Sequence, residues 1–177
     1  MSTIPPRDPE RLRIEPERPG DAIKISQLTA AAFAPMPFSD GDEPRVIDAL
    51  REAGALTVSL VALTADAELV GHLALSPVRI DGQPGDWYGL GPISVAPRLQ
   101  RRGVGSALIA RGLDRLRELK AGGCVLLGDP NYYSRFGFLS DPTLTYQGKP
   151  NPYFQRLVLK APPAKGDVSF HPAFDPP

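Results

Sequence analysis

Apolar and polar residues alternate through three consecutive segments in the middle of the chain, residues 57–63, 69–80 and 87–95. A period of two is typical of half-buried strands. Polar or glycine-containing connections at residues 65–67 and 81–85 separate the segments. The pattern predicts an antiparallel meander that forms the middle of a sheet.

Residues 104–118 follow a helical pattern, in which apolar side chains recur three and four positions apart. This spacing predicts an amphipathic helix. We expect Gly122 and Gly123 to end it and residues 124–127 to form a short buried strand, so the chain crosses over between two strands. The expected apolar face consists of Val104, Leu108, Ile109, Leu113 and Leu116.

The N-terminal part predicts an edge strand at residues 12–14 and two helices. Asp21 is expected to cap the first helix, which ends before the prolines of residues 35–37. Asp42 is expected to cap the second helix, and Gly54 follows its end.

After residue 127 the sequence predicts a short helix around residues 132–136 and strands near Leu144 and at residues 157–159. Strands and helices of these lengths predict a mixed α/β fold. At 177 residues the chain is expected to form one domain over residues 12–174, after a flexible N-terminal tail at residues 1–11.

A glycine loop joins the last meander strand to the long helix. Residues 90–97 read as a strand that runs into Gln100-Arg101-Arg102-Gly103-Val104-Gly105. Unpaired amides and the dipole at a helix start attract phosphate, and glycines let it approach the backbone. Arg101 and Arg102 add positive charge. The layout therefore predicts a phosphate-binding loop, and a simple strand-to-helix turn is the competing interpretation.

Two other phosphate motifs do not fit this loop. A P-loop requires Lys followed by Ser or Thr after its last glycine, but Ser106-Ala107 follows Gly105. A dinucleotide-binding fingerprint requires a third glycine where Leu108 stands.

The loop and its flanks resemble the GCN5-related N-acetyltransferases (GNAT). Residues 100–105 resemble the family's Gln/Arg-x-x-Gly-x-Gly/Ala, residues 95–97 resemble its Val-x-Pro strand end, and residues 133–138 resemble its Tyr-x-x-x-Gly-Phe. Gly128 to Phe138, together with the closing residues 171–174, further resembles the YhbS-like branch of bacterial predicted acetyltransferases. The resemblance covers about residues 12–174.

This resemblance implies a GNAT fold, with a mostly antiparallel twisted sheet, a splayed strand pair and flanking helices, and acetyl-CoA as the cofactor. The backbone of residues 93–95 would hold the pantetheine arm and direct an amide at the acetyl oxygen, and the amides of residues 101–106 would hold the pyrophosphate. Asn131 is expected either to bind the cofactor or to cap the short helix. The expected cofactor-binding residues are Ile93, Ser94, Val95, Gln100, Arg101, Arg102, Gly103, Val104, Gly105, Ser106, Asn131 and Tyr133.

Acetyl transfer to an amine requires a proton for the leaving thiolate and a route for the amine proton. Tyr133 stands at the family's tyrosine and is the predicted acid, with Tyr132 as its rival. For the acceptor side, His72 is a candidate for substrate binding or a structural histidine, and Asp42 belongs to an acidic lip or to a helix cap. The further candidates are Asp40, Glu43, Asp129 and His171.

The composition limits the partners. Lys and Arg together number 20, and Asp and Glu together also number 20. The formal net charge is therefore zero, which does not favour binding to nucleic acid or to an anionic membrane. The single cysteine, Cys124, lies in an apolar segment and reads as a buried hydrophobe, which disfavours a covalent route. We expect no metal, and a cytoplasmic location because no signal or membrane-spanning segment is apparent.

These observations predict an acetyl-CoA-dependent N-acetyltransferase that acts on a small-molecule or protein amine by direct attack in a ternary complex. The alternative is a non-catalytic acyl-CoA-binding or sensor module, which would keep the loop glycines and need no proton-transfer side chain. The resemblance also implies a possible homodimer.

Overall fold

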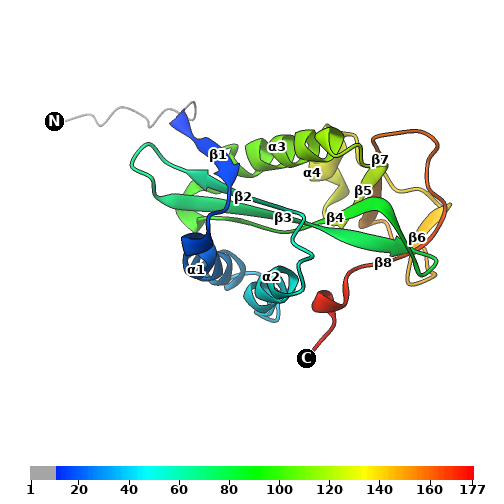
Figure 1. The fold of residues 1–177 in the computed structure, drawn as a ribbon, viewed down its shortest axis with the longest axis horizontal. Coiled ribbons are helices and arrows are strands. Elements are labelled where there is room, and N and C mark those ends of the chain that lie inside the picture. Colours follow the sequence, from blue (N-terminus) through cyan, green and yellow to red (C-terminus); the bar gives the residue numbers. More distant parts are fainter. Residues whose placement is uncertain (1–10) are drawn as a thin grey trace.

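The computed structural model describes residues 11–177, and it has a central sheet between two layers of helices. Helices α1 (Ala22–Phe33) and α2 (Glu43–Glu52) lie on one face, and α3 (Val104–Glu118) lies on the other (Figure 1). The predicted mixed α/β class is confirmed. The flexible tail expected at residues 1–11 lies, except for Arg11, outside the described residues.

The sheet has eight strands in the order β1-β2-β3-β4-β5-β7, and β8 pairs with both β3 and β6. The β4–β5 and β6–β8 pairs are parallel and the others are antiparallel, so the sheet is mostly antiparallel, as predicted. The strands are β1 (Arg13–Pro16), β2 (Val58–Leu63), β3 (Leu69–Ile80), β4 (Gln83–Val95), β5 (Gly123–Leu127), β6 (Leu144–Tyr146), β7 (Phe154–Val158) and β8 (Gly166–Ser169).

The β3–β4 connection is shorter than predicted. Ile80 pairs with Gln83, so only Asp81 and Gly82 form the turn, in place of the five residues expected at 81–85. Both have positive φ angles, 50° and 75°. Two consecutive left-handed residues define the turn that matches the twist of a hairpin, and an Asp-Gly pair favours it. The strands therefore extend several residues beyond the alternating apolar pattern.

Strands β4 and β5 separate after a short contact. They pair only between Trp87–Gly89 and Gly123–Val125. Next to this contact β4 carries a bulge, because Leu73 pairs with Ile93 whereas Leu75 pairs with Leu90. Gly91 (φ 135°) and Pro92 form the bulge, where a proline costs no regular sheet hydrogen bond. The edge of β4 beyond the bulge is thus free of a neighbouring strand on the β5 side.

Helix α3 packs closely on β3 through the predicted apolar face, whose five residues are all buried. A Cβ atom at Gly112 would lie 3.0 Å from Leu73 Cδ2, and one at Gly71 would lie 2.9 Å from Leu108 Cδ1. Glycines on both elements therefore bring the helix down onto the strand, which fixes the glycine loop at its N-terminus relative to β4.

The end of α3 corrects the sequence prediction. The helix ends at Glu118, and the left-handed residue that follows is Lys120 (φ 58°) rather than a glycine. Gly122 and Gly123 instead make room for Trp87, because a Cβ at Gly123 would collide with the indole ring. These glycines serve the contact between β4 and β5.

The predicted caps of the first two helices are also wrong in detail. Asp21 and Asp42 occupy the N-cap positions as predicted, and each helix begins at the next residue, but neither aspartate accepts a hydrogen bond from its helix through the side chain. Asp21 accepts a hydrogen bond from the Arg18 amide (2.8 Å), and Asp42 accepts one from Arg45 Nε (2.6 Å). The Arg45 guanidinium lowers the pKa of Asp42. Each carboxylate thus has a nearer partner than the first-turn amides.

His72 is completely buried between the sheet and the α1–α2 layer. Its Nε2 lies 2.8 Å from Ser59 Oγ, and no hydrogen bond reaches Nδ1 within the described residues. Burial, with a smaller contribution from the positive charge of Arg51, lowers the pKa of His72 to about 3. The imidazole is therefore neutral in the folded protein, which supports the structural interpretation of this residue.

Burial of neutral His72 makes stability depend on pH. The unfolded chain binds a proton near the ordinary pKa of about 6.5, while the folded protein does so only near 3. The contribution of neutral His72 to the free energy of unfolding is thus fully present above about pH 6.5. As the pH falls from about 6.5 toward about 3, the free energy of unfolding decreases by up to about 1.4 kcal/mol per pH unit. Urea unfolding at pH 7, 6 and 5 measures this slope. The slope of His72→Gln should be smaller by this amount, and equal slopes would contradict the burial argument.

Candidate active site

The glycine loop ends in a helix N-terminus with free amides. Gly103 precedes α3 in a left-handed conformation (φ 86°), as does Arg101 (φ 63°). The first helical hydrogen bond runs from the Ala107 amide to the Gly103 carbonyl (3.0 Å). The amides of residues 104–106 therefore have no partner within the helix, and the helix dipole favours an anion beside them.

A cavity of about 780 Å³ opens beside this loop. Gly105 faces it, because a Cβ there would meet only ordinary contacts, at 3.5 Å from the Tyr132 hydroxyl and 3.7 Å from Val95 Cγ2. The basic side chains of Arg101 and Arg135 also line it. The remaining lining residues are Ala32, Phe33, Met36, Ile93, Val95, Gln100, Gly103, Ser106, Asp129, Tyr132 and Tyr133.

The free edge of β4 forms one wall of this first cavity. The Ala96 amide donates to the Val70 carbonyl of β3 (2.8 Å). Since backbone groups alternate in direction along a strand, those of Ser94 also face β3, and those of Ile93 and Val95 face the gap between β4 and β5. Gln100 Nε2 donates to the Val95 carbonyl (3.2 Å). The strand thus offers the Ile93 and Val95 amides to an extended ligand.

Helix α4 (Pro130–Tyr133) forms the opposite wall. Asp129 caps it by accepting the Asn131 amide at Oδ1 (2.9 Å). The Tyr132 hydroxyl lies 3.1 Å from Ser106 Oγ, and the Arg135 guanidinium stacks over the Tyr132 ring at 4.4 Å. Tyr132 is therefore engaged by α3 and by Arg135, whereas the hydroxyl of Tyr133 has no hydrogen-bond partner among residues 11–177.

The phenol of Tyr133 is protonated at neutral pH. Burial raises the pKa of its phenol to about 12, with smaller contributions from Tyr132 and Cys124. Its ring packs edge to face against Tyr132 and Phe138, at centroid distances of 4.9 and 6.0 Å. The two aromatic contacts hold the ring in place while the hydroxyl keeps its proton.

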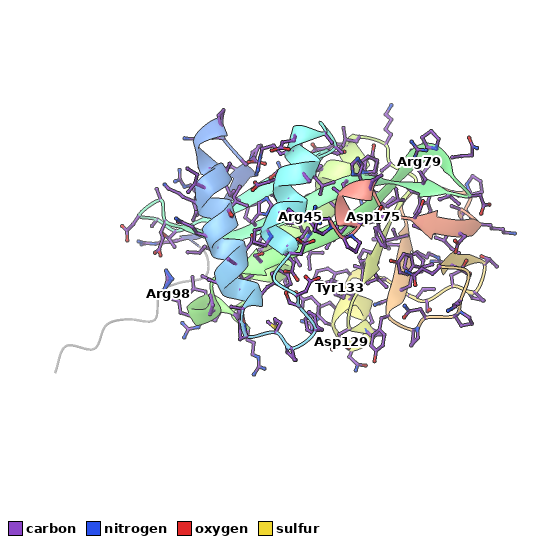
Figure 2. The ribbon with its side chains drawn as sticks, turned by 90° about the horizontal axis from the view of Figure 1, so that it is seen from below. Arg45, Arg79, Arg98, Asp129, Tyr133 and Asp175 are labelled. Carbon is purple, nitrogen blue, oxygen red and sulfur yellow. The ribbon has the colours of Figure 1, made fainter. Side chains whose placement is uncertain are left out.

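A second cavity of about 1180 Å³ adjoins the first. Four residues line both cavities: Phe33, Ile93, Asp129 and Tyr133. Figure 2 shows Asp129 and Tyr133 close together at one end of this region, with Arg45 and Asp175 above them. The junction therefore combines a strand amide, a protonated phenol and a carboxylate.

The two cavities differ in charge. Arg101 and Arg135 line the first, whereas no Lys or Arg of the described chain lines the second. The second is bordered instead by the carboxylates of Glu43, Asp129, Asp167 and Asp175. One cavity thus suits an anion and the other suits a cation.

Eight of the twelve predicted cofactor-binding residues line the first cavity, and four do not. The Ser94 hydroxyl donates to Thr29 on the other face of the sheet (3.3 Å), and the Val104 side chain is buried in the core. Arg102 and Asn131 are exposed beside the cavity. Asn131 does not cap the short helix either, because Asp129 does so.

The two predicted substrate-binding residues lie outside both cavities. His72 is buried, and the Asp42 carboxylate is paired with Arg45. His171 also lies outside, and its Nδ1 accepts the Ala173 amide (3.0 Å). Of the expected acidic lip, only Glu43 lines the second cavity, with both oxygens accepting from Ser39 Oγ at 2.6 and 2.8 Å.

The sequence analysis missed most of the second cavity. Arg135, which lines the first cavity, lies in the Tyr-x-x-x-Gly-Phe segment, but nothing in the sequence identified it as a site residue. The aromatic residues that line the second cavity come from segments far apart in the chain and have no shared spacing. Apart from Tyr133, which its motif had singled out, they are Phe33, Phe38, Tyr146, Tyr153, Phe170 and Phe174.

Cys124 is fully buried, and burial raises the pKa of its thiol, so it is not an available nucleophile. Across residues 11–177, no group of three or more His, Cys, Asp or Glu is arranged to hold a metal. None of the described helices has the length and apolar character that a membrane span requires.

Known proteins are similar to this chain in sequence and in fold. The N-acetyltransferase YhbS of Escherichia coli strain K12 is 38% identical over 125 residues, which cover 71% of this chain and 72% of YhbS. A crystal structure of YhbS from Escherichia coli in complex with CoA superposes with a TM-score of 0.82 at 32% identity, covering 98% of this chain and 96% of that one.

A GNAT family acetyltransferase from Brucella melitensis, crystallised in complex with acetyl-CoA, is 48% identical, with a TM-score of 0.83, and covers 93% of this chain and 98% of its own. The expected fold family and the YhbS-like branch are thereby confirmed. The family model of the acetyltransferase (GNAT) family matches residues 25–138. This range contains the free strand edge, the glycine loop and the two tyrosines, and the chain belongs to the acetyltransferase (GNAT) family.

Proposed function

We propose that the protein is an acetyl-CoA-dependent N-acetyltransferase in which an amine attacks the acetyl group directly in a ternary complex. The observation that carries this proposal is the junction of two oppositely charged cavities at Ile93, Asp129 and Tyr133. An anionic donor and a cationic acceptor can enter from opposite sides and meet there. The solved relatives with bound acetyl-CoA and CoA support the choice of donor.

The residues of the first cavity fit this donor. The amides at the start of α3 and the side chains of Arg101 and Arg135 suit its phosphates. The amides of Ile93 and Val95 suit the amide groups of the pantetheine arm, because they face a gap that no strand fills. Acetyl-CoA supplies an activated acetyl thioester, and the protein supplies its position.

Two groups at the junction serve the transfer. The Ile93 amide is placed to meet the negative charge that develops on the acetyl oxygen. The amine nitrogen forms a bond to the acetyl carbon, the carbon–sulfur bond breaks, and Tyr133 gives its proton to the departing thiolate. The amine releases one proton before attack and one after it, to Asp129 or to water. Tyr133 regains its proton from the same route.

The cytoplasmic location and the homodimer remain predictions. The cytoplasmic location fits the use of acetyl-CoA, and cell fractionation tests it. The homodimer is tested by light scattering of the purified protein at several concentrations.

Gly105→Val should abolish tight donor binding without unfolding the protein. The added Cβ meets only ordinary contacts in the protein, and the methyl groups beyond it fill the space in front of the helix amides. We expect the Kd for acetyl-CoA, measured by calorimetry, to rise by at least about tenfold. Ala110→Val, on the exposed face of the same helix, adds the same kind of bulk and should bind normally. Equal affinities for the two variants would refute the phosphate-binding loop.

Tyr133→Phe should lower kcat by about a hundredfold, the usual worth of a general acid. The Kd for acetyl-CoA should stay within about twofold, because the lost hydroxyl has no structural partner. Tyr132→Phe is the matched control, since that hydroxyl contacts Ser106, and it should retain most of the turnover. The rates are read from thiol release with an amine found in a panel. A Tyr133→Phe enzyme with unchanged kcat would remove Tyr133 as the acid, whereas binding without turnover in the wild type would favour the sensor module.

A further inference from the structure

We infer that the acceptor is a small primary amine carried on an aromatic or similarly bulky apolar group, and that acceptors with a negative charge near the amine are rejected. This inference rests on the proposed function, and it concerns the second cavity alone. Its basis is the combination of aromatic walls, carboxylates and the absence of lining cations within the described chain.

Aromatic rings form the walls of the second cavity. Tyr146, Phe170 and Phe174 make a continuous cluster, with centroid distances of 5.3 Å between the first two and 5.7 Å between the last two. Phe154 stacks behind Tyr146 at 5.6 Å. Rings fixed by other rings present a rigid apolar surface, which a planar apolar ligand can cover at low entropic cost.

Two further aromatic side chains at this cavity are exposed to solvent. Phe38 is 80% exposed and Tyr153 is 59% exposed, and both line the cavity. Large apolar side chains exposed together at a cavity gain free energy when a ligand covers them. They come from segments that are far apart in the sequence, since Phe38 precedes α2 and Tyr153 precedes β7. An aromatic acceptor lying between them would bury both.

Hydrogen-bond donors of the protein reach three of the cavity's four carboxylates, but no cation of the described chain pairs with any of them. None of Glu43, Asp129, Asp167 and Asp175 forms a salt bridge within residues 11–177. Asp167 Oδ1 accepts from Thr145 Oγ1 and from the Gly148 amide, both at 2.8 Å, so it also braces β6 against β8. Arg45 Nη2 holds the backbone carbonyl of Asp175 at 2.9 Å, which leaves that carboxylate at the cavity.

Asp129 fixes the direction of the acceptor. It is the only carboxylate among the described residues that lines both cavities, and it stands beside Tyr133 at the junction. An ammonium group drawn to Asp129 places its nitrogen beside the donor site, and the aromatic group then extends toward Phe170 and Phe174. The cavity, at about 1180 Å³, has room for a one- or two-ring amine.

The charges and rings of the second cavity also predict which acceptors it excludes. A carboxylate or phosphate on the acceptor would approach four carboxylates with no lining cation to compensate. Sugar amines and linear polyamines would leave the aromatic walls uncovered or bury hydroxyl and ammonium groups without partners. A peptide lysine would reach the junction with its side chain alone and leave the rings exposed.

The experiment compares acceptors that differ in one property. With acetyl-CoA saturating, initial rates are measured for 2-phenylethylamine, tryptamine, n-butylamine, ethanolamine and phenylalanine. Phenylalanine is 2-phenylethylamine with one added carboxylate. We expect kcat/KM for 2-phenylethylamine and tryptamine to exceed that of n-butylamine and ethanolamine by at least about tenfold. We expect a similar loss from 2-phenylethylamine to phenylalanine, compared at the pH where the amines are equally protonated.

Two variants assign the preference to the cavity. Phe38→Ala should raise KM for the aromatic amines by about threefold to tenfold, with kcat and the Kd for acetyl-CoA unchanged. Ile23→Ala removes an equally exposed side chain from α1 (72% exposed) and should change nothing. Asp175→Asn should reduce the discrimination against phenylalanine, whereas Asp66→Asn, in the exposed β2–β3 turn, should not.

The possible outcomes separate this inference from the function on which it rests. Faster turnover of ethanolamine or n-butylamine than of the aromatic amines, or equal turnover of phenylalanine and 2-phenylethylamine, would overturn the inference and leave the acetyltransferase intact. Binding of acetyl-CoA with no turnover of any of the five amines would also overturn it. Failure to bind acetyl-CoA at all would remove the proposed function itself.

Discussion

The early separation of β4 from β5 is the constraint on which the site depends. The two strands pair over three residues only, and the contact is set by Trp87 against Gly123, where no larger residue fits. Beyond it, the bulge at Gly91 and Pro92 turns the free edge of β4 toward α4. A fully paired sheet would satisfy the Ile93 and Val95 amides internally and leave no slot for an extended ligand. The packing of Trp87 on Gly123 therefore helps to set where the gap between β4 and β5 begins.

Electrostatics divides this opening into two parts of opposite charge. The start of α3 and the arginines give one side a preference for anions, and the carboxylates give the other side a preference for cations. Tyr133 stands between them with its pKa raised to about 12 by burial. A group that stays protonated between an anion site and a cation site can donate a proton to a thiolate without being ionised by either neighbour. Position and protonation state thus arise from the same burial.

The fold and the donor side of the site were readable from sequence because both depend on local patterns. Periodicity located the meander and α3, and the spacing of Gly103 and Gly105 located the loop. Details failed where a side chain had a choice of partners. Asp42 binds Arg45 instead of the helix amides, and Asp81-Gly82 closes a tighter turn than the apolar pattern indicates. His72 lay on the less apolar face of its strand, but the α1–α2 layer covers that face. The acceptor cavity has no sequence signature, because its rings come from segments up to 141 positions apart, from Phe33 to Phe174.

The C-terminal segment shows how such a cavity is held together. Its last 3-10 turn (Pro172–Phe174) packs Ala173 against Val46 and Leu50 of α2. Arg45, fixed by Asp42, binds the carbonyl groups of Ala173 and Asp175 at 3.4 and 2.9 Å. Asp42, a candidate for the acidic lip, therefore acts one step away, because it fixes Arg45, which holds Phe174 and Asp175 at the cavity wall. Under the proposed function, the donor slot depends on β4 and β5 and the acceptor wall depends on this clamp. Acceptor preference can then change without disturbing the binding of the donor.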